Sequence, residues 1–81
     1  MTGRPYRDGS PLWEKVYAAI HGQIQDGTLR PGARLDPVAE IARTHDVSRA
    51  TVSRALSVLR RRGFVVSRPG EGYWVTRVQD L

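Results

Sequence analysis

Cysteine is absent from the 81 residues of this chain. Its absence excludes disulfide bonds and thiolate metal sites, and it agrees with a protein of the reducing cytosol. The sequence also lacks an apolar run long enough for a membrane span or for the core of a signal peptide. We therefore expect a cytoplasmic protein without a membrane partner.

Histidine is scarce, and His21 and His45 have no carboxylate pattern beside them that would indicate a metal site or an acid–base pair. We expect His21 on the outer side of a first helix and His45 in a turn, each in contact with solvent or with a helix end. A chain of this length forms one domain with a small core and has little room for a catalytic pocket. The sequence thus predicts no enzyme activity, no catalytic residue, no metal and no cofactor.

Acidic residues are missing from one long stretch of the chain. Residues 47–70 contain six arginines and no aspartate or glutamate, and the formal net charge of the whole chain is +5. A guanidinium group binds phosphates and guanine edges through two parallel hydrogen bonds, which an ammonium group cannot do. A polyanion such as DNA or RNA is therefore the expected partner.

The same stretch has the pattern of a helix-turn-helix. A helix of about two turns is expected to begin with Asp36 as the N-cap and Pro37 as its first residue, and to end at Asp46 with positive φ. Ser48 then caps an amphipathic helix over residues 49–62. Its apolar stripe comprises Val52, Ala55, Leu56 and Leu59, and its opposite face comprises Ala50, Ser53, Arg54, Ser57 and Arg61. Small residues between arginines allow such a face to approach base edges.

An earlier helix is predicted between Ser10, as the N-cap, and Gly27, with Pro11 at its first position. Its apolar positions are spaced as on a helix, and they comprise Trp13, Val16, Tyr17, Ile20 and Ile24. We expect its Trp and Tyr in the core. The connector that follows contains a turn at residues 30–32 and a very short strand at residues 34–35.

Two segments rich in β-branched and aromatic residues, 64–68 and 73–77, flank a turn at 69–72 and predict a β-hairpin. A two-stranded hairpin is marginal alone, so it must pack on the helices. The side chains expected to do so are Phe64, Val65, Trp74 and Val75, and those expected to leave an apolar strip are Val66, Tyr73 and Val78.

Three helices followed by a two-stranded hairpin make a winged helix-turn-helix, an α+β fold that is mostly α. We divide the chain into a flexible N-terminal arm (1–9), the winged helix-turn-helix domain (10–77) and a C-terminal tail or start of a linker (78–81).

Five segments resemble the DNA-binding domain of GntR-type bacterial transcription regulators: residues 11–14, 27–35, 47–56, 63–65 and 70–75. The combination of Leu-Arg-Pro-Gly at 29–32 with Val-Ser-Arg-Ala-Thr-Val at 47–52 is far more specific than either motif alone. The resemblance implies a recognition helix, residues 48–62, in the major groove of double-stranded DNA. It also implies a wing, residues 64–77, against the minor groove or the backbone.

The predicted DNA-binding residues combine that resemblance with the polar face of the helix. They are Ser48, Arg49, Ala50, Thr51, Ser53, Arg54, Ser57, Arg61, Arg68 and Gly70. Ser48 and Thr51 lie in the first helical turn, where free amides favour a phosphate. We expect Arg49 and Arg54 to select bases, and the arginines at 60–62 to act electrostatically.

Three departures from the family pattern predict a changed operator. Ala39 stands where the family has an arginine on DNA, Arg54 is shifted by one position along the recognition helix, and Glu71 replaces a common basic residue in the wing. Family members usually continue into an effector-binding, dimerising domain, whereas this sequence stops at Leu81. It is either an excised domain or a small stand-alone regulator, and no small-molecule effector site can be assigned.

The expected partner is double-stranded DNA, read by a homodimer on a palindromic operator at the nucleoid. A protein–protein interaction module that uses the apolar strip of the hairpin is the alternative. RNA binding is disfavoured because few aromatic residues are expected at exposed stacking positions.

Overall fold

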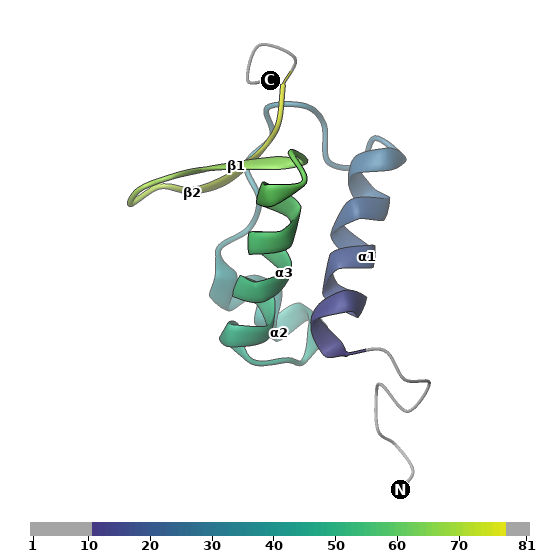
Figure 1. Cartoon of the computed structure of the whole chain (residues 1–81), viewed down its shortest axis with the longest axis vertical. Helices are drawn as coiled ribbons and strands as arrows, with labels where there is room; N and C mark the ends of the chain where they lie inside the picture. Colours follow the sequence, from purple (N-terminus) through teal and green to yellow (C-terminus); the bar gives the residue numbers. More distant parts are fainter. Residues whose placement is uncertain (1–10, 78–81) are drawn as a thin grey trace, which may run out of the picture.

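The computed structural model describes residues 11–77. Its elements are α1 (Leu12–Gln25), α2 (Val38–His45), α3 (Arg49–Arg61), β1 (Val65–Arg68) and β2 (Gly72–Val75), with the two strands antiparallel. Figure 1 shows α1 and α3 side by side, α2 beside the lower part of α3, and the hairpin projecting from the upper end of α3. The predicted winged helix-turn-helix is confirmed. The predicted arm (1–9) and tail (78–81) lie outside the described residues.

The starts of α1 and α2 differ from the prediction by one residue. Pro11 (φ −63°, ψ 154°) and Pro37 (φ −58°, ψ 152°) are the N-caps themselves, and neither cap is closed by a side-chain hydrogen bond. Asp36 therefore does not cap α2, and Ser10 lies outside the described residues. Proline fixes φ near −65°, which suits both an extended cap and a first helical residue, so the sequence alone could not separate the two positions.

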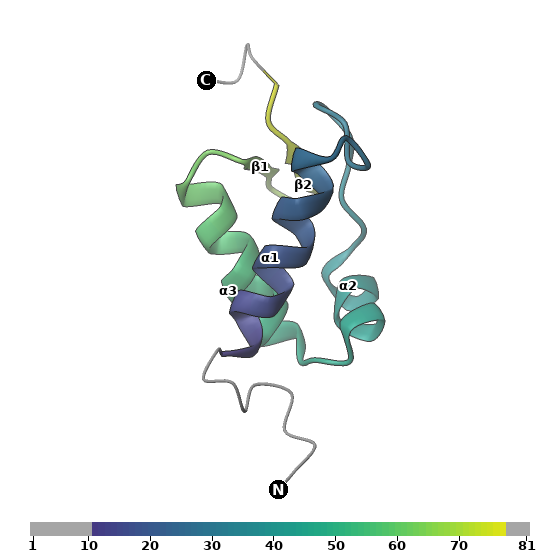
Figure 2. The same ribbon diagram turned by 90° about the vertical axis from the view of Figure 1, so that its right-hand side faces the viewer.

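The core lies where α1, α2 and α3 meet, and the hairpin closes one end of it. The predicted stripe of α3 is fully buried, and Val58 joins it at 7% exposure. The other buried core residues are Val16, Ile20, Leu35, Ile41, Ala42, Val65 and Val75. Trp13 and Tyr17, predicted as core, are half-buried and pack against its edge. Figure 2, turned by 90°, shows α2 on the far side of α1 and α3 from the viewpoint of the first figure.

The hairpin presents a different aromatic residue to the core from the one expected. Because Val65 pairs with Val75 and Ser67 with Tyr73, side chains that alternate along β2 put Tyr73 and Val75 on the core side. Tyr73 packs against the core, and Trp74 lies on the outer face of the hairpin. The prediction that Phe64, Val65 and Val75 pack on the helices is confirmed. The predictions that Trp74 does so and that Tyr73 lies in an exposed apolar strip are wrong.

The connector before α2 adds a third segment to the sheet. The Leu35 amide donates to the Tyr73 carbonyl (2.9 Å), the Val75 amide donates to the Ala33 carbonyl (2.8 Å), and Arg34 forms a β-bridge with Trp74. The predicted short strand at 34–35 is thus confirmed as a single bridge. β2 is the middle segment, between β1 and the connector.

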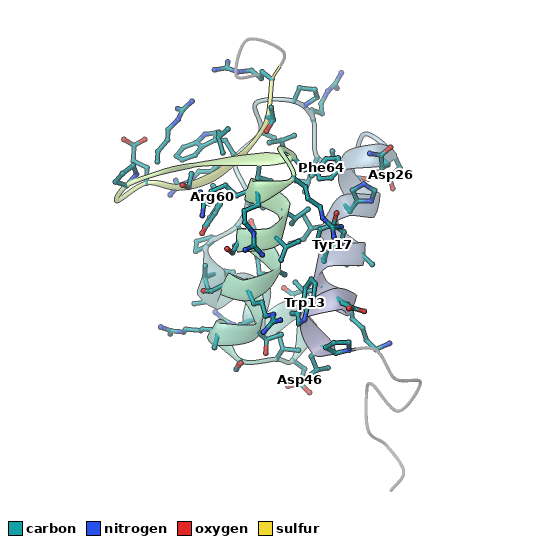
Figure 3. All side chains as sticks on the ribbon, viewed as in Figure 1. Trp13, Tyr17, Asp26, Asp46, Arg60 and Phe64 are labelled. Atoms are coloured by element: carbon teal, nitrogen blue, oxygen red, sulfur yellow. The ribbon has the colours of Figure 1, made fainter. Side chains whose placement is uncertain are left out.

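Aromatic rings form a row along α1. Tyr17 stands edge-on to Trp13 (6.4 Å between centroids) and stacks on His21 (5.7 Å), and His21 meets Phe64 edge-on at 4.7 Å. Figure 3 labels Trp13, Tyr17 and Phe64 between α1 and α3. The prediction that His21 contacts only solvent or a helix end is therefore wrong, because its ring bridges α1 to the residue that precedes the hairpin.

Candidate nucleic-acid interface

The turn between α2 and α3 is closed by Asp46, which adopts the left-handed conformation (φ 55°, ψ 50°) as predicted. Its amide and that of Val47 donate to carbonyl groups at the end of α2, and the Val47 amide reaches the Ala42 carbonyl at 3.0 Å. These bonds satisfy the end of α2 and reverse the chain within three residues. The turn thereby sets the direction in which α3 leaves α2, with its amino end at the surface.

Ser48 caps α3 as predicted, and it does so together with Thr51. The Thr51 amide donates to Ser48 Oγ (3.1 Å), and the two hydroxyl oxygens lie 2.9 Å apart. Only one of the two hydroxyl protons is used between them. The other O–H can donate outward, and it lies beside the unpaired amides of the first turn. This arrangement suits an anion such as a phosphate.

We expect Ser48→Ala to lower the free energy of unfolding by about 1 kcal/mol, because α3 loses its only side-chain cap. For a domain of this size the melting temperature should fall by roughly 4–8 °C. Ser53→Ala is the matched control, since Ser53 is exposed on the same helix and carries no cap. The melting temperatures are measured by thermal unfolding, monitored by circular dichroism. Equal melting temperatures for both variants would contradict the role of Ser48.

The amino end of α3 is more positive than that of the other two helices. The first turns of α1 and α2 contain Glu14 and Glu40, whereas the first turn of α3 has no acidic residue and begins with Arg49. A cation at the positive end of a helix dipole is unfavourable for folding. Arg49 therefore does not stabilise α3 through the helix dipole.

The predicted residues of α3 lie on one accessible face. Thr51 and Ser57 are half-buried, and the exposed members are Ser48, Arg49, Ala50, Ser53, Arg54 and Arg61. Arg60 was left out of the predicted set, yet it is exposed and lies three residues beyond Ser57, so it continues the same face. Its helical spacing from Ser53 and Ser57 was the available signal. Figure 3 labels Arg60 near the hairpin, at the far end of α3 from its capped turn.

Arg54 of α3 and Arg62, the C-cap of that helix, contact aromatic residues of α1. The guanidinium carbon of Arg54 lies 5.2 Å from the ring centroid of Trp13, and that of Arg62 lies 5.2 Å from the centroid of Tyr17. Arg62 also donates to the Tyr17 hydroxyl at 3.1 Å. Cation–π contact of this kind restrains a guanidinium group without neutralising it. The arginines at 60–62 are all exposed, and Arg62 differs from the other two because it contacts Tyr17 of α1.

The wing ends in a tight turn that exposes its backbone. Gly70 adopts φ 75°, and the Glu71 amide donates to the Arg68 carbonyl at 2.9 Å. Gly70 is exposed and has open space where a Cβ would stand. Arg68, also exposed, lies over Trp74 with its guanidinium carbon 4.7 Å from the ring centroid. The structure therefore brings Arg68 and Gly70 together in the wing.

Comparison with known proteins shows which family this chain belongs to. The model of bacterial regulatory proteins of the gntR family matches residues 12–75, which comprises all three helices and both strands. The chain belongs to the GntR family. That family consists of regulatory proteins and not of enzymes, as the sequence predicted.

Curated relatives of this GntR-family chain are transcriptional regulators. This chain is 37% identical over 71 residues to an HTH-type transcriptional repressor of Salmonella typhimurium. It is 36% identical over 72 residues to the histidine utilization repressor of Klebsiella aerogenes. The matches cover 88% and 89% of this chain and 30% of each relative. The chain thus spans less than a third of the length of these regulators.

Solved structures of similar shape include the DNA-binding domain of AraR. The AraR N-terminal domain in complex with a mutant operator superimposes with a TM-score of 0.81 at 27% identity, over 83% of this chain and 96% of that one. A GntR-family transcriptional regulator from Listeria monocytogenes gives a TM-score of 0.83 at 28% identity, over 89% and 63% of the two chains. Among the described residues of this GntR-family chain, no helix is long and apolar enough to cross a membrane.

Proposed function

We propose that this GntR-family domain binds double-stranded DNA in a sequence-specific manner, with α3 in the major groove and the hairpin against the minor groove or the backbone. The observation that carries the proposal is the exposed face of α3, which combines small side chains with arginines and has no acidic residue. The AraR domains that share its fold were crystallised with operator DNA, which supports the same use of this fold here.

The residues of the interface take different roles. Arg49, exposed at the start of α3, reads a base edge, and Arg54, restrained by Trp13, reads the neighbouring one. The hydroxyl groups of Ser48 and Thr51 contact a backbone phosphate. Ala50, Ser53 and Ser57 have small side chains that let the helix approach the bases. Arg61 and Arg68 neutralise phosphates, and Gly70, which has no side chain, lets the backbone of the wing approach the duplex.

Two copies of the chain bind one palindromic operator in the cytoplasm, at the nucleoid. One recognition helix and one wing form a small footprint, of about 600–1,000 Å² for a single module, and two-fold related modules commonly read paired half-sites. The AraR complexes support a duplex operator as the partner, and the symmetry is our own inference. We assign no small-molecule effector site to this chain.

In vitro selection of bound duplexes from a random pool tests the function directly. A palindromic consensus should emerge, and the full palindrome should bind more tightly than a single half-site in a mobility-shift titration, with two chains per duplex. Equal affinity and one chain per duplex on both probes would contradict the dimer. Enrichment of no sequence at all would contradict sequence-specific binding.

Salt dependence separates the arginines at the end of α3. We expect Arg61→Ala to reduce the slope of log affinity against log salt concentration by about 1, because one phosphate contact is lost. Arg62→Ala should leave that slope unchanged and lower the melting temperature, because Arg62 binds Tyr17. The slopes are measured by fluorescence anisotropy on a labelled duplex. If Arg61→Ala and the unmutated protein had equal slopes, Arg61 would interact only with the carboxyl end of α3 and would not contact a phosphate.

The alternative function, a protein–protein interaction module, is not favoured by the hairpin. Its proposed apolar strip needed Tyr73 at the surface, and Tyr73 packs against the core while Val66 is half-buried. Val78 lies outside the described residues. Binding through apolar contacts would also persist as the salt concentration rises, whereas binding to phosphates weakens steeply.

A further inference from the structure

Arg34 lies far from the wing in the sequence but contacts it in the structure. It belongs to the connector between α1 and α2, and its β-bridge with Trp74 places both side chains on the outer face of the sheet. Its guanidinium carbon lies 5.4 Å from the Trp74 ring centroid. Since Arg68 approaches the same ring at 4.7 Å from β1, on the other side of β2, Trp74 lies between two arginines.

The Arg34 side chain also reaches the tip of the wing. Its Nη2 donates to the Glu71 carbonyl at 2.6 Å, across 37 positions of sequence. The Arg34 side chain passes close to Gly72 on its way to this carbonyl, and a Cβ added at Gly72 would lie 3.7 Å from Nη2. Gly72 adopts φ 111°. Only glycine adopts that conformation readily. The turn thus exposes a carbonyl group to the guanidinium, and the bond fixes the tip to the body of the domain.

A two-stranded hairpin held only at its base would be free to bend. The core residues Val65 and Val75 pack at the base of this hairpin, whereas Ser67 and Arg68 near the tip are exposed. The Leu35 amide of the connector reaches Tyr73, and the Arg34 side chain reaches one step further, to the Glu71 carbonyl in the turn itself. Arg34 is thus the described side chain of the connector that hydrogen-bonds the turn of the wing.

We propose that Arg34 is a positioning residue for DNA binding: it fixes the wing so that Arg68 and Gly70 meet the duplex. The guanidinium lies over Trp74 and donates to the Glu71 carbonyl at the same time, and its flat shape and fork of N–H groups suit this pair of contacts better than a compact ammonium group. The inference rests on the proposed function, and it adds to the interface a residue that neither the recognition helix nor the hairpin contains.

The test compares Arg34→Ala, Arg34→Lys and the control Arg30→Ala. Arg30 is an exposed arginine of the same connector, so its removal changes the charge equally without touching the wing. Loss of one stacked and one hydrogen-bonded contact should weaken binding to the selected duplex about tenfold. Arg34→Lys should be nearly as weak as Arg34→Ala, and Arg30→Ala should change the affinity less than about twofold.

Footprinting locates the loss on the DNA. In Arg34→Ala, protection of guanine N7 in the major groove should persist at saturating protein, while hydroxyl-radical protection of the minor groove beside it should disappear. Trp74→Ala should give the same pattern, and Trp74→Phe should restore it. The double variant Arg34→Ala/Arg68→Ala should bind little worse than Arg68→Ala alone, because both act through the wing.

Other results would contradict either the positioning role of Arg34 or the proposed DNA binding. Full affinity in Arg34→Lys, or equal affinities in Arg34→Ala and Arg30→Ala, would overturn the positioning role. If Arg34→Ala lost both kinds of protection and had a lower melting temperature, the positioning role would also be overturned. Arg34 would then contribute only to the stability of the fold. Absence of any protection by the unmutated protein would instead contradict the proposed function.

Discussion

Arg49→Ala should lose roughly 5- to 150-fold of the preference for its operator over unrelated DNA. A bidentate arginine–guanine pair accounts for about 1–3 kcal/mol of discrimination against the wrong base, and Arg49 is exposed at the start of the helix that we place in the major groove. Binding to random duplex should weaken only by the loss of one positive charge. The measurement is the ratio of the two dissociation constants at one salt concentration.

The fold of this variant should be intact. Arg49 stands at the positive end of the α3 dipole, with no acidic residue in the first turn, so its removal should leave the melting temperature unchanged or slightly higher. Arg30→Ala, with the same change of charge, should keep the full ratio of affinities. If Arg49→Ala weakened both kinds of binding equally, Arg49 would be a phosphate contact and the base contacts would lie elsewhere on α3.

Leu56→Ala should lower the free energy of unfolding by about 2–5 kcal/mol, because it leaves a cavity in the packed interior. Leu56 is fully buried and is among the largest such side chains of the domain. Small domains have a total stability near the lower end of about 5–15 kcal/mol. Much of the protein should therefore be unfolded near physiological temperature, and DNA binding should be lost with the fold.

Urea denaturation of Leu56→Ala and Leu56→Met checks this expectation. Methionine keeps the volume, so Leu56→Met should lose less than about 1.5 kcal/mol. The slope of the unfolding free energy against urea concentration should stay the same in both variants. A loss below about 1 kcal/mol in Leu56→Ala would mean that the helices close the cavity, and that α3 is less tightly held against α1 than its burial indicates.

The helix-turn-helix could be predicted because its signals are local. Ser48 precedes an amphipathic run whose period places Val52, Leu56 and Leu59 on one stripe, and a single residue, Asp46, suits the positive φ of the turn. All of these were confirmed. The family motifs at 29–32 and 47–52 then implied which helix and which hairpin face DNA.

The contacts that cross between elements could not be read from the sequence. Nothing near Arg34 indicates that it reaches the tip of a hairpin 37 positions away, and nothing near Trp13 indicates that it holds Arg54. The places of Tyr73 and Trp74 were missed for a simpler reason. Both Trp74 and Val75 were expected on the core, although neighbouring residues of a strand point to opposite faces.

The chain has two tryptophans, and their positions allow their intrinsic fluorescence to report on the two parts of the interface. Trp13 lies against Arg54 at the recognition helix, and Trp74 lies against Arg34 and Arg68 in the wing. Any movement of those arginines toward phosphates changes the surroundings of one indole and not of the other. Variants with a single tryptophan would therefore report, through their fluorescence, whether helix and wing engage the duplex together or in sequence.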